Sequence, residues 1–350
     1  MAELTSKEKL VFYGISKWPE LSDEDLSKKI DVKRPTVTAI RNKLLKERFY
    51  TLHNLPDLYK IGCELMVTRY GDFNPLTPWS KRAKYASKEP ELFYRISTDT
   101  SRVSIVAARN FTEIKKYLDT AATRHGSHGF LTPYGVEHVY QPYGLTKRFV
   151  FFDFAPLLNK NFELGFSEKK ELDYDFSEYK PANLSSTEKM VLYALVKYPE
   201  MKDKEIAEKI SMTRQTVNNV RQKLFSTGLV KTVIFPDLNK LGFELVVLSH
   251  MTYTPESTVK KSKECIKEIV SEGSNYVIAY SDMESVKLSA FKNYTSFEST
   301  WDNIMSSYTK CGITVKNATI KLYPTCDIRN HMMLRCDPLV KKILNIEKEI

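Results

Sequence analysis

One stretch of this sequence occurs twice, and the repeat constrains the fold more than any other feature. Val32–Leu44 has its copy in Met212–Leu224, 180 residues further along the chain. The offset holds without a gap between residues 4–65 and residues 184–245. A fixed period of this length predicts tandem domains rather than a solenoid of short repeats.

Each copy carries the signals of three short helices. Thr5 and Ser185 each stand three residues before a glutamate, which is the pattern of a capping box. Prolines 19 and 199 end the first helix. Ser22 caps the second helix of the first copy; Lys202 replaces it in the second copy, so we expect Asp203 to take over as the cap. Apolar residues of the third helix recur at helical spacing and predict one buried stripe: Val37, Ile40 and Leu44, matched by Val217, Val220 and Leu224.

The opposite face of the third helix is basic and polar. Residues 33–48 hold six Lys or Arg and one acid, and residues 213–231 hold four and no acid. We interpret the three helices as a winged helix-turn-helix whose third helix enters the major groove. Asn and Gln there pair with adenine, Thr contacts a thymine methyl, and Arg binds phosphates. The predicted DNA-binding residues are Arg34, Thr36, Thr38, Arg41, Asn42, Lys46, Thr213, Arg214, Gln215, Thr216, Asn218, Asn219, Arg221, Gln222 and Lys231.

Two short strands after each third helix are expected to form the wing, over residues 49–55 and 229–235. Lys231 would reach a phosphate from the second wing. The alternative is a solvated basic helix face in a fold that no longer binds DNA.

Composition favours an anionic partner. The chain has 350 residues and a formal net charge of +10, which suits double-stranded DNA. Its five scattered cysteines indicate reduced thiols and a cytoplasmic location. The polar start of the chain predicts no signal peptide. Apolar runs shorter than about 18 residues predict no membrane partner.

A second pattern follows each helix-turn-helix, in the order βαββαβ of a ferredoxin-like module. In the C-terminal half the predicted elements are Phe243–Thr252, Ser257–Ser271, Asn275–Tyr280, Ser285–Phe291, Phe297–Cys311 and Ile313–Tyr323. The N-terminal half is less regular, with candidates at Glu64–Tyr70, Trp79–Ser87, Leu92–Ser97, Val103–Ala108, Phe111–Thr123 and near Val136–Tyr140. The predicted fold class is therefore α+β.

Three stretches carry a family resemblance: Thr213–Leu224, Thr227–Lys231 and the connector Pro236–Gly242. With the βαββαβ module behind the connector, the chain resembles the leucine-responsive regulator (Lrp/AsnC) family. That family has one copy of each domain and dimerises through the ferredoxin-like part. The resemblance implies a fused pseudo-dimer here, with a homodimer of chains through the same modules as a further expectation.

The chain departs from that family at two places. Lys33, followed by Pro35, stands where a Ser or Thr cap is usual and Thr213 keeps it. The family's effector turn usually contains glycine, and neither Ser281–Glu284 nor Ser97–Thr100 has one. Asp282 and Glu284 are the candidate effector-binding residues, but the missing glycine argues against an amino-acid effector.

The expected domains are a winged helix-turn-helix at 1–62, a ferredoxin-like domain with an extra strand at 63–160, a mobile linker at 161–183, a second winged helix-turn-helix at 184–242 and a second ferredoxin-like domain at 243–350. A C-terminal helix is predicted at Pro338–Ile350, and the extra strand within Phe149–Leu158.

Other chemistry was weighed against these predictions. Cys326, His331 and Cys336 do not have a usual zinc spacing, so no metal is expected. His125, His128 and His138 cluster beside glycines typical of a loop. No phosphate loop, nucleophile elbow or catalytic carboxylate pair is evident, so we expect no enzyme, no catalytic residues and no cofactor.

These observations predict a sequence-specific transcription regulator. Its reading faces differ between the copies, which predicts an asymmetric operator. Two alternatives stay open: an enzyme of tetrapyrrole (haem) synthesis, because some proteins resembling this family are decarboxylases that use histidines, and a protein-interaction scaffold that has lost DNA binding.

Overall fold

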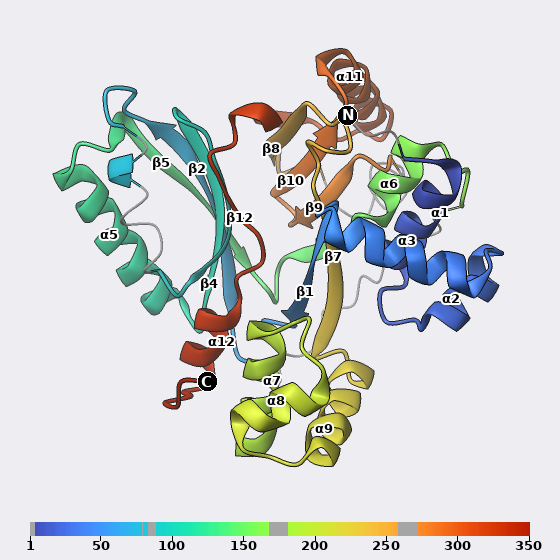
Figure 1. Ribbon diagram of the computed structural model, residues 1–350. Helices are drawn as coiled ribbons and strands as arrows, with labels where there is room; N and C mark the ends of the chain where they lie inside the picture. Colours follow the sequence, from blue (N-terminus) through green and yellow to red (C-terminus); the bar gives the residue numbers. More distant parts are fainter. Residues whose placement is uncertain (1–3, 79, 83–88, 168–180, 258–271) are drawn as a thin grey trace. The chain divides into compact units, whose positions relative to one another are not determined.

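The computed structural model describes residues 4–78, 80–82, 89–167, 181–257 and 272–350 (Figure 1). The chain divides into two compact units. Unit 1 comprises residues 1–51, 146–175 and 233–326, and unit 2 comprises residues 52–145, 176–232 and 327–350. Within the described part of the chain, every helix is too short or too polar to cross a membrane.

Each repeat begins with three helices. The first repeat has α1 (Ser6–Lys17), α2 (Asp23–Ile30) and α3 (Arg34–Lys46), and the second has α7 (Ser186–Lys197), α8 (Asp203–Ile210) and α9 (Arg214–Ser226). Both capping boxes form, from Thr5 with Glu8 and from Ser185 with Glu188. Five residues of the predicted stripe are buried, namely Val37, Ile40, Leu44, Val217 and Leu224, whereas Val220 is half-buried.

The cap predicted for α8 differs from the structure. Asp203 is the first helical residue and does not cap the helix. Instead the Glu205 carboxylate accepts a hydrogen bond from the Lys202 backbone N–H, at 2.8 Å. This leaves the Asp203 side chain available to the next helix.

The predicted wings do not form as local hairpins. The strands that follow the third helices, β1 (Tyr50–Pro56) and β7 (Val230–Pro236), make up one two-stranded sheet. In unit 2 the Asp57 N–H donates to the Leu229 carbonyl at 2.8 Å, and in unit 1 the Asp237 N–H donates to the Phe49 carbonyl at 2.8 Å. The residues after each strand form a turn, not a returning strand, and each strand pairs with its copy in the other repeat.

The ferredoxin-like module of unit 2 contains β2 (Leu65–Phe73), β3 (Leu92–Ser97), β4 (Ser101–Ala108), α5 (Phe111–Ser127) and β5 (Leu131–Pro142). Its sheet has the order β12-β3-β4-β2-β5 with antiparallel pairs throughout, so β12 (Asn330–Met332) extends the four-stranded core. The tail then forms α12 (Asp337–Ile343), which packs on α7 and β4.

The module of unit 1 has the same plan. Its elements are β8 (Leu245–Tyr253), β9 (Asn275–Tyr280), β10 (Glu284–Phe291), α11 (Tyr294–Lys310) and β11 (Val315–Pro324). The sheet order is β11-β8-β10-β9-β6, where β6 (Lys147–Phe151) is the added edge strand. Helix α6 (Ala155–Phe162) follows β6 and packs on α1 and β9.

The fold class is confirmed: two helix-turn-helix domains, each followed in sequence by a ferredoxin-like module. The expected domain limits differ from the structure at the added elements. The strand expected in the first module pairs with β9 of the second, and α12, expected in the second module, lies in the unit of the first. The expected helices at 79–87 and 257–271 fall largely outside the described residues, as does most of the expected linker.

The cysteines correct one expectation. Cys63, Cys326 and Cys336 are not in disulfide bonds, but Cys311 is disulfide-bonded, so the prediction that all five are reduced thiols is wrong.

Candidate nucleic-acid interface

An aspartate at the start of the second helix fixes each third helix. The Asp203 carboxylate accepts from the Asn218 amide at 2.9 Å and from Arg221 Nε at 2.6 Å. In the first repeat Asp23 accepts from the Thr38 hydroxyl at 2.7 Å and pairs with Arg41 Nε at 2.8 Å. Each repeat therefore has an aspartate of the second helix bound to an arginine and to one further side chain of the third helix, a threonine in the first repeat and an asparagine in the second. We call this set of contacts the brace.

A second contact ties the third helix to the first. Lys43 Nζ donates to the Glu8 carboxylate at 2.6 Å, and Lys223 Nζ donates to the Glu188 carboxylate at 2.5 Å. These lysine hydrogen bonds hold the pKa of each glutamate below its usual range. These glutamates also close the capping boxes. In each repeat, one carboxylate therefore both caps the first helix and binds a lysine of the third helix.

The predicted DNA-binding residues separate into two groups by exposure. The exposed ones are Arg34, Asn42, Lys46, Thr213, Arg214, Gln215, Asn219, Gln222 and Lys231. The half-buried ones are Thr36, Thr38, Arg41, Thr216, Asn218 and Arg221. Four of the half-buried side chains are those that bind Asp23 or Asp203, and Thr213 accepts from the Thr216 N–H at 3.1 Å as the cap of α9.

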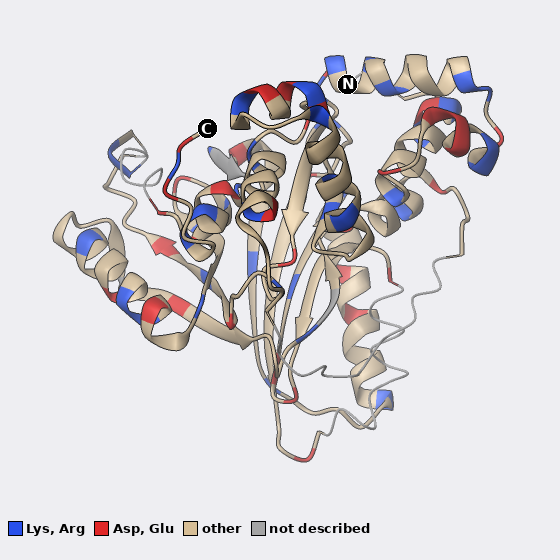
Figure 2. Cartoon of the chain, turned by 90° about the horizontal axis from the view of Figure 1, so that it is seen from below, with Lys and Arg blue, Asp and Glu red and all other residues tan. Residues whose placement is uncertain are grey.

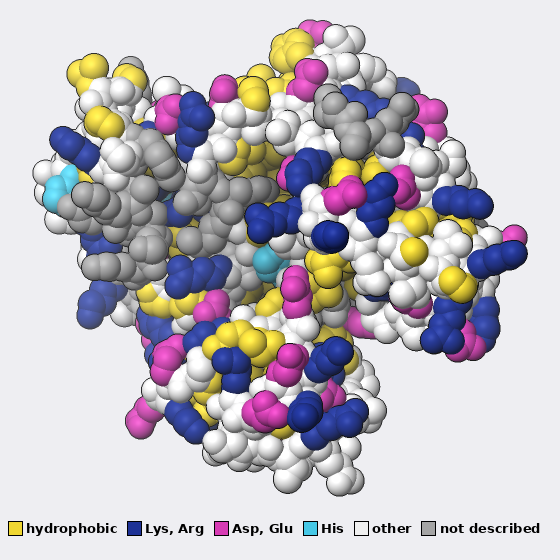
Figure 3. All heavy atoms as spheres, viewed as in Figure 1, with side chains coloured by type: hydrophobic (Ala, Val, Ile, Leu, Met, Phe, Trp, Pro, Cys, Tyr) yellow, Lys and Arg dark blue, Asp and Glu magenta, His cyan; other side chains and the backbone are white. Residues whose placement is uncertain are grey.

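Charge on the helix-turn-helix surfaces is mixed. Lysines and arginines are spread over many segments of the chain (Figure 2). In the view of Figure 3, basic side chains are scattered over the surfaces of both helix-turn-helix domains, with acidic side chains among them. Arg34 Nη1 lies 3.7 Å from a Glu24 carboxylate oxygen, and both side chains are exposed.

The candidate effector residues lie at the β9–β10 turn. Asp282 is exposed, while the Glu284 carboxylate lies 3.4 Å from His250 Nε2. The corresponding turn of the other module holds Asp99, which pairs with Arg329 at 3.3 Å.

Three histidines weighed for catalysis lie in different settings. His125 is buried and its Nδ1 lies 3.3 Å from Arg102 Nη2. Burial lowers the pKa of His125 to about 3 and that of His138 to about 4, so both are neutral at pH 7. His128 is exposed near the Phe130 ring. Among the described side chains, no three His, Cys, Asp or Glu come together as a metal site.

Sequence reasoning missed a cluster of buried arginines in the module of unit 2. Arg69, Arg95 and Arg102 are each at most 6% exposed. They stand within strands whose residues are almost all buried. A cation inside a fully buried strand was the available signal, because such residues are rarely buried without a partner.

Comparisons with known proteins agree with this architecture. Residues 180–234 match the family model described as the sugar-specific transcriptional regulator TrmB. The crystal structure of the siroheme decarboxylase NirDL matches with a TM-score of 0.54 and 10% identity, over 97% of this chain and 99% of that chain. Its complex with an iron-uroporphyrin III analogue matches with a TM-score of 0.53 and 10% identity, over 97% of this chain and 100% of that chain.

Shorter matches include an AsnC family transcriptional regulator from Agrobacterium tumefaciens, at 13% identity and a TM-score of 0.34, over 40% of this chain and 90% of that chain. The search of curated protein sequences found no match.

The full-length match corrects one expectation. We expected no enzyme, yet two structures that align over 97% of this chain are those of an enzyme, the siroheme decarboxylase NirDL. At 10% identity this match establishes the tandem fold. The motifs whose absence led to that expectation belong to other enzyme folds. Their absence therefore does not exclude catalysis on this fold.

Proposed function

We propose that this protein is a sequence-specific regulator that binds double-stranded DNA through α3 and α9. The observation that carries the proposal is the outer face of α9. Arg214, Gln215, Asn219 and Gln222 are exposed on it, and no acid lies between residues 213 and 231. The match of residues 180–234 to a transcriptional regulator family supports the same conclusion.

Exposed and braced residues have different roles in this proposal. Gln215, Asn219 and Gln222 contact base edges, since amide side chains pair bidentately with adenine. Arg214 contacts a phosphate and contributes affinity without sequence preference. Asn218 and Arg221 position α9 through Asp203.

The first recognition helix presents a different surface. Arg34, Asn42 and Lys46 are exposed on α3, whereas its start lacks a side-chain cap and carries Pro35. Because α3 and α9 present different side chains, one chain would prefer an asymmetric site. Two chains joined through their ferredoxin-like modules would restore a palindrome.

The experiment compares two neighbouring asparagines. Asn219→Ala should weaken binding to the preferred operator by about 1–3 kcal/mol and leave binding to random duplex unchanged. Arg214→Ala should weaken binding to both. Asn218→Ala is the matched control, since its main effect should be on stability. If neither Asn219→Ala nor Arg214→Ala changes either affinity, α9 does not contact DNA.

A second candidate is a siroheme-decarboxylase-like enzyme. It is favoured by the alignment with NirDL, which covers nearly all of both chains. The test is incubation with siroheme, followed by absorbance spectroscopy and mass spectrometry. A shifted spectrum would report binding, and a product lighter by carbon dioxide would support the enzyme. Siroheme recovered with unchanged mass would contradict it.

A further inference from the structure

The buried arginines of unit 2 lie between the sheet and α5. Arg69 on β2 stands over the Tyr117 ring of α5, 5.1 Å from its centroid. Arg102 on β4 lies 3.3 Å from the His125 ring of the same helix. Arg95 on β3 is opposite Ser104 in the sheet, as is Arg69. Side chains opposite one another share a face of a sheet, so we call Arg69, Arg95 and Arg102 the arginine cluster.

Among the described side chains, the carboxylate of Glu89 accompanies these three cations. Glu89 Oε2 lies 3.6 Å from Arg69 Nη2 and accepts a hydrogen bond from the Tyr117 hydroxyl at 2.6 Å. The acids of α5 point elsewhere: Glu113 pairs with Arg109, and the exposed Asp119 pairs with Lys115. His125 is neutral because burial and the nearby Arg102 lower its pKa to about 3.

The segment before Glu89 brings no further acid. Residues 73–88 contain no Asp or Glu and four Lys or Arg. One of these, Arg82, lies with its guanidinium 3.9 Å from the centroid of the Phe73 ring, which Arg102 also faces at 5.1 Å. Among the described residues, Glu89 is therefore the acid whose charge acts on all three arginines of the cluster.

Arg102 has unused hydrogen-bonding capacity. It is 6% exposed, and its Nε–H has no partner among the described residues. The residue opposite it on β2 is Gly71, which places no side chain over it. Burial and the neighbouring Arg69 lower the pKa of Arg102 to about 9. Burying a cation in this way is unfavourable unless an anion accompanies it.

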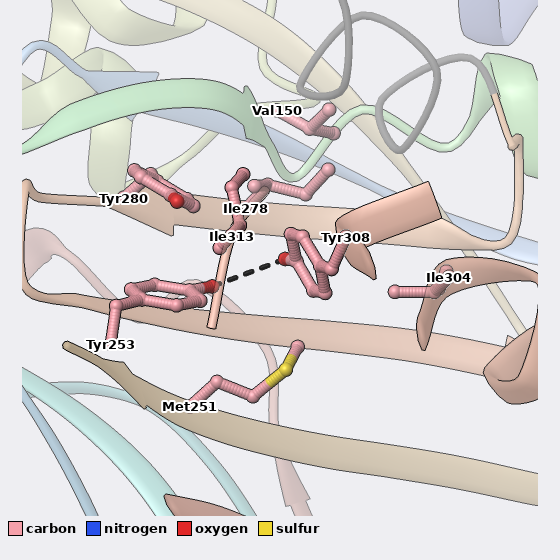
Figure 4. Close-up of a cluster of buried hydrophobic side chains, with 8 residues drawn as sticks. All are labelled: Val150, Met251, Tyr253, Ile278, Tyr280, Ile304, Tyr308 and Ile313. Atoms are coloured by element: carbon pink, nitrogen blue, oxygen red, sulfur yellow. Dashed lines mark hydrogen bonds between the residues drawn. The ribbon is translucent and has the colours of Figure 1, made fainter. Parts of the chain in front are cut away.

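The other module shows that the fold does not require arginines here. Strand pairing places Leu65 opposite Ala108 in one sheet and Leu245 opposite Phe291 in the other. This correspondence makes Ser249, Ile278 and Ser285 the counterparts of Arg69, Arg95 and Arg102. That core is filled by apolar and aromatic side chains, with Tyr253 and Tyr308 joined by a hydrogen bond of 3.1 Å (Figure 4).

Among the described residues of the unit 1 module, the buried cation is differently placed. Lys287 is the counterpart of Ser104, and its ammonium donates to the Tyr308 hydroxyl at 2.9 Å. The two modules thus share a backbone plan, but among the described residues only the module of unit 2 gathers guanidinium groups beneath its helix.

We propose that the arginine cluster binds a small metabolite bearing two negative charges, as carboxylates or as a phosphate. Three guanidinium groups against one carboxylate leave two positive charges, which a dianion neutralises. The planar fork of arginine matches both oxyanions in a bidentate manner. The site goes beyond the proposed DNA binding and uses none of its residues.

The experiment is thermal denaturation of the full chain in sodium phosphate, sodium succinate or sodium chloride at equal ionic strength. We expect phosphate or succinate to raise Tm above its value in chloride, because a ligand of the native state stabilises it. The more effective of the two identifies the ligand as a phosphate or a dicarboxylate.

Arg102→Gln should abolish the oxyanion-dependent rise and weaken phosphate or succinate binding at least about tenfold in calorimetric titration. Lys287→Met is the matched control, a buried cation removed from the other module, and should keep the rise. Equal Tm values in the three salts for the wild-type protein, or an equal rise in Arg102→Gln, would overturn the proposal. If Arg102→Gln does not fold, the wild-type calorimetric titration decides alone.

Discussion

Asp203 links the start of α8 to α9. It binds Asn218 and Arg221 together, and its side chain is 14% exposed. Asp203→Ala would leave the half-buried Arg221 without its carboxylate. We expect a loss of about 1–3 kcal/mol in the free energy of unfolding, measured by urea denaturation.

The control for Asp203→Ala is Lys204→Ala, at an exposed position of the same helix. It should change stability by less than about 0.5 kcal/mol. Equal effects of the two substitutions would contradict the brace.

The buried Lys287 should make the stability of the protein depend on pH. Burial lowers its pKa to about 7, whereas an unfolded lysine titrates near ~10.4. Between these values the unfolded chain binds the extra proton, so stability rises with pH across that window, by up to about 1.4 kcal/mol per pH unit. Below pH 7 the unfavourable burial of the charge is fully present.

Urea denaturation at pH 7 and pH 9 measures this effect. The wild-type protein should gain stability relative to Lys287→Met between the two values. Parallel behaviour of the two proteins would mean that the folded lysine stays charged at both pH values, as a solvated lysine would.

At the level of single residues, sequence alone gave the exposed face of α9 but not the braces. Asn218 lies on the outer face of the helix by periodicity, yet Asp203 from the preceding helix binds it. Such a contact depends on the angle between two helices, which no local pattern records. The arginine cluster was missed because each arginine comes from a different strand.

Among the elements, the N-terminal ends of α3 and α9 differ. Thr213 caps α9 through the Thr216 N–H, while Lys33 makes no side-chain cap for α3. Thr213→Ala should reduce the free energy of unfolding by about 1 kcal/mol, and Lys33→Thr should raise it by a similar amount. Thermal denaturation of both variants tests the pair, and opposite signs are required.

The added strands and helices extend the repeat further than the sequence pattern indicated. β6 with α6 and β12 with α12 are corresponding elements, since Phe152 and Leu334, like Glu163 and Asn345, share a positive φ at equivalent places. Pro156 and Pro338 also stand in the first turns of α6 and α12. Few side chains agree between these segments, so periodicity could not identify them.

At the level of the whole molecule, the tandem architecture was predictable and its division into units was not. The gapless offset of 180 residues gave two copies of one plan. Each helix-turn-helix, however, falls in the unit of the other copy's ferredoxin-like module. The chain passes from one unit to the other within β1 and again within β7, and no local sequence pattern marks these two points.

The central proposal is that the protein binds a specific DNA site through α3 and α9. The most direct measurement is a titration of the protein with genomic fragments, including its own promoter, at two salt concentrations with random duplex as competitor. We expect tight binding to one fragment that survives the competitor. Four or more phosphate contacts should give a slope of about −3.6 or steeper in a plot of log affinity against log salt. Weak and equal binding to all fragments would contradict the claim.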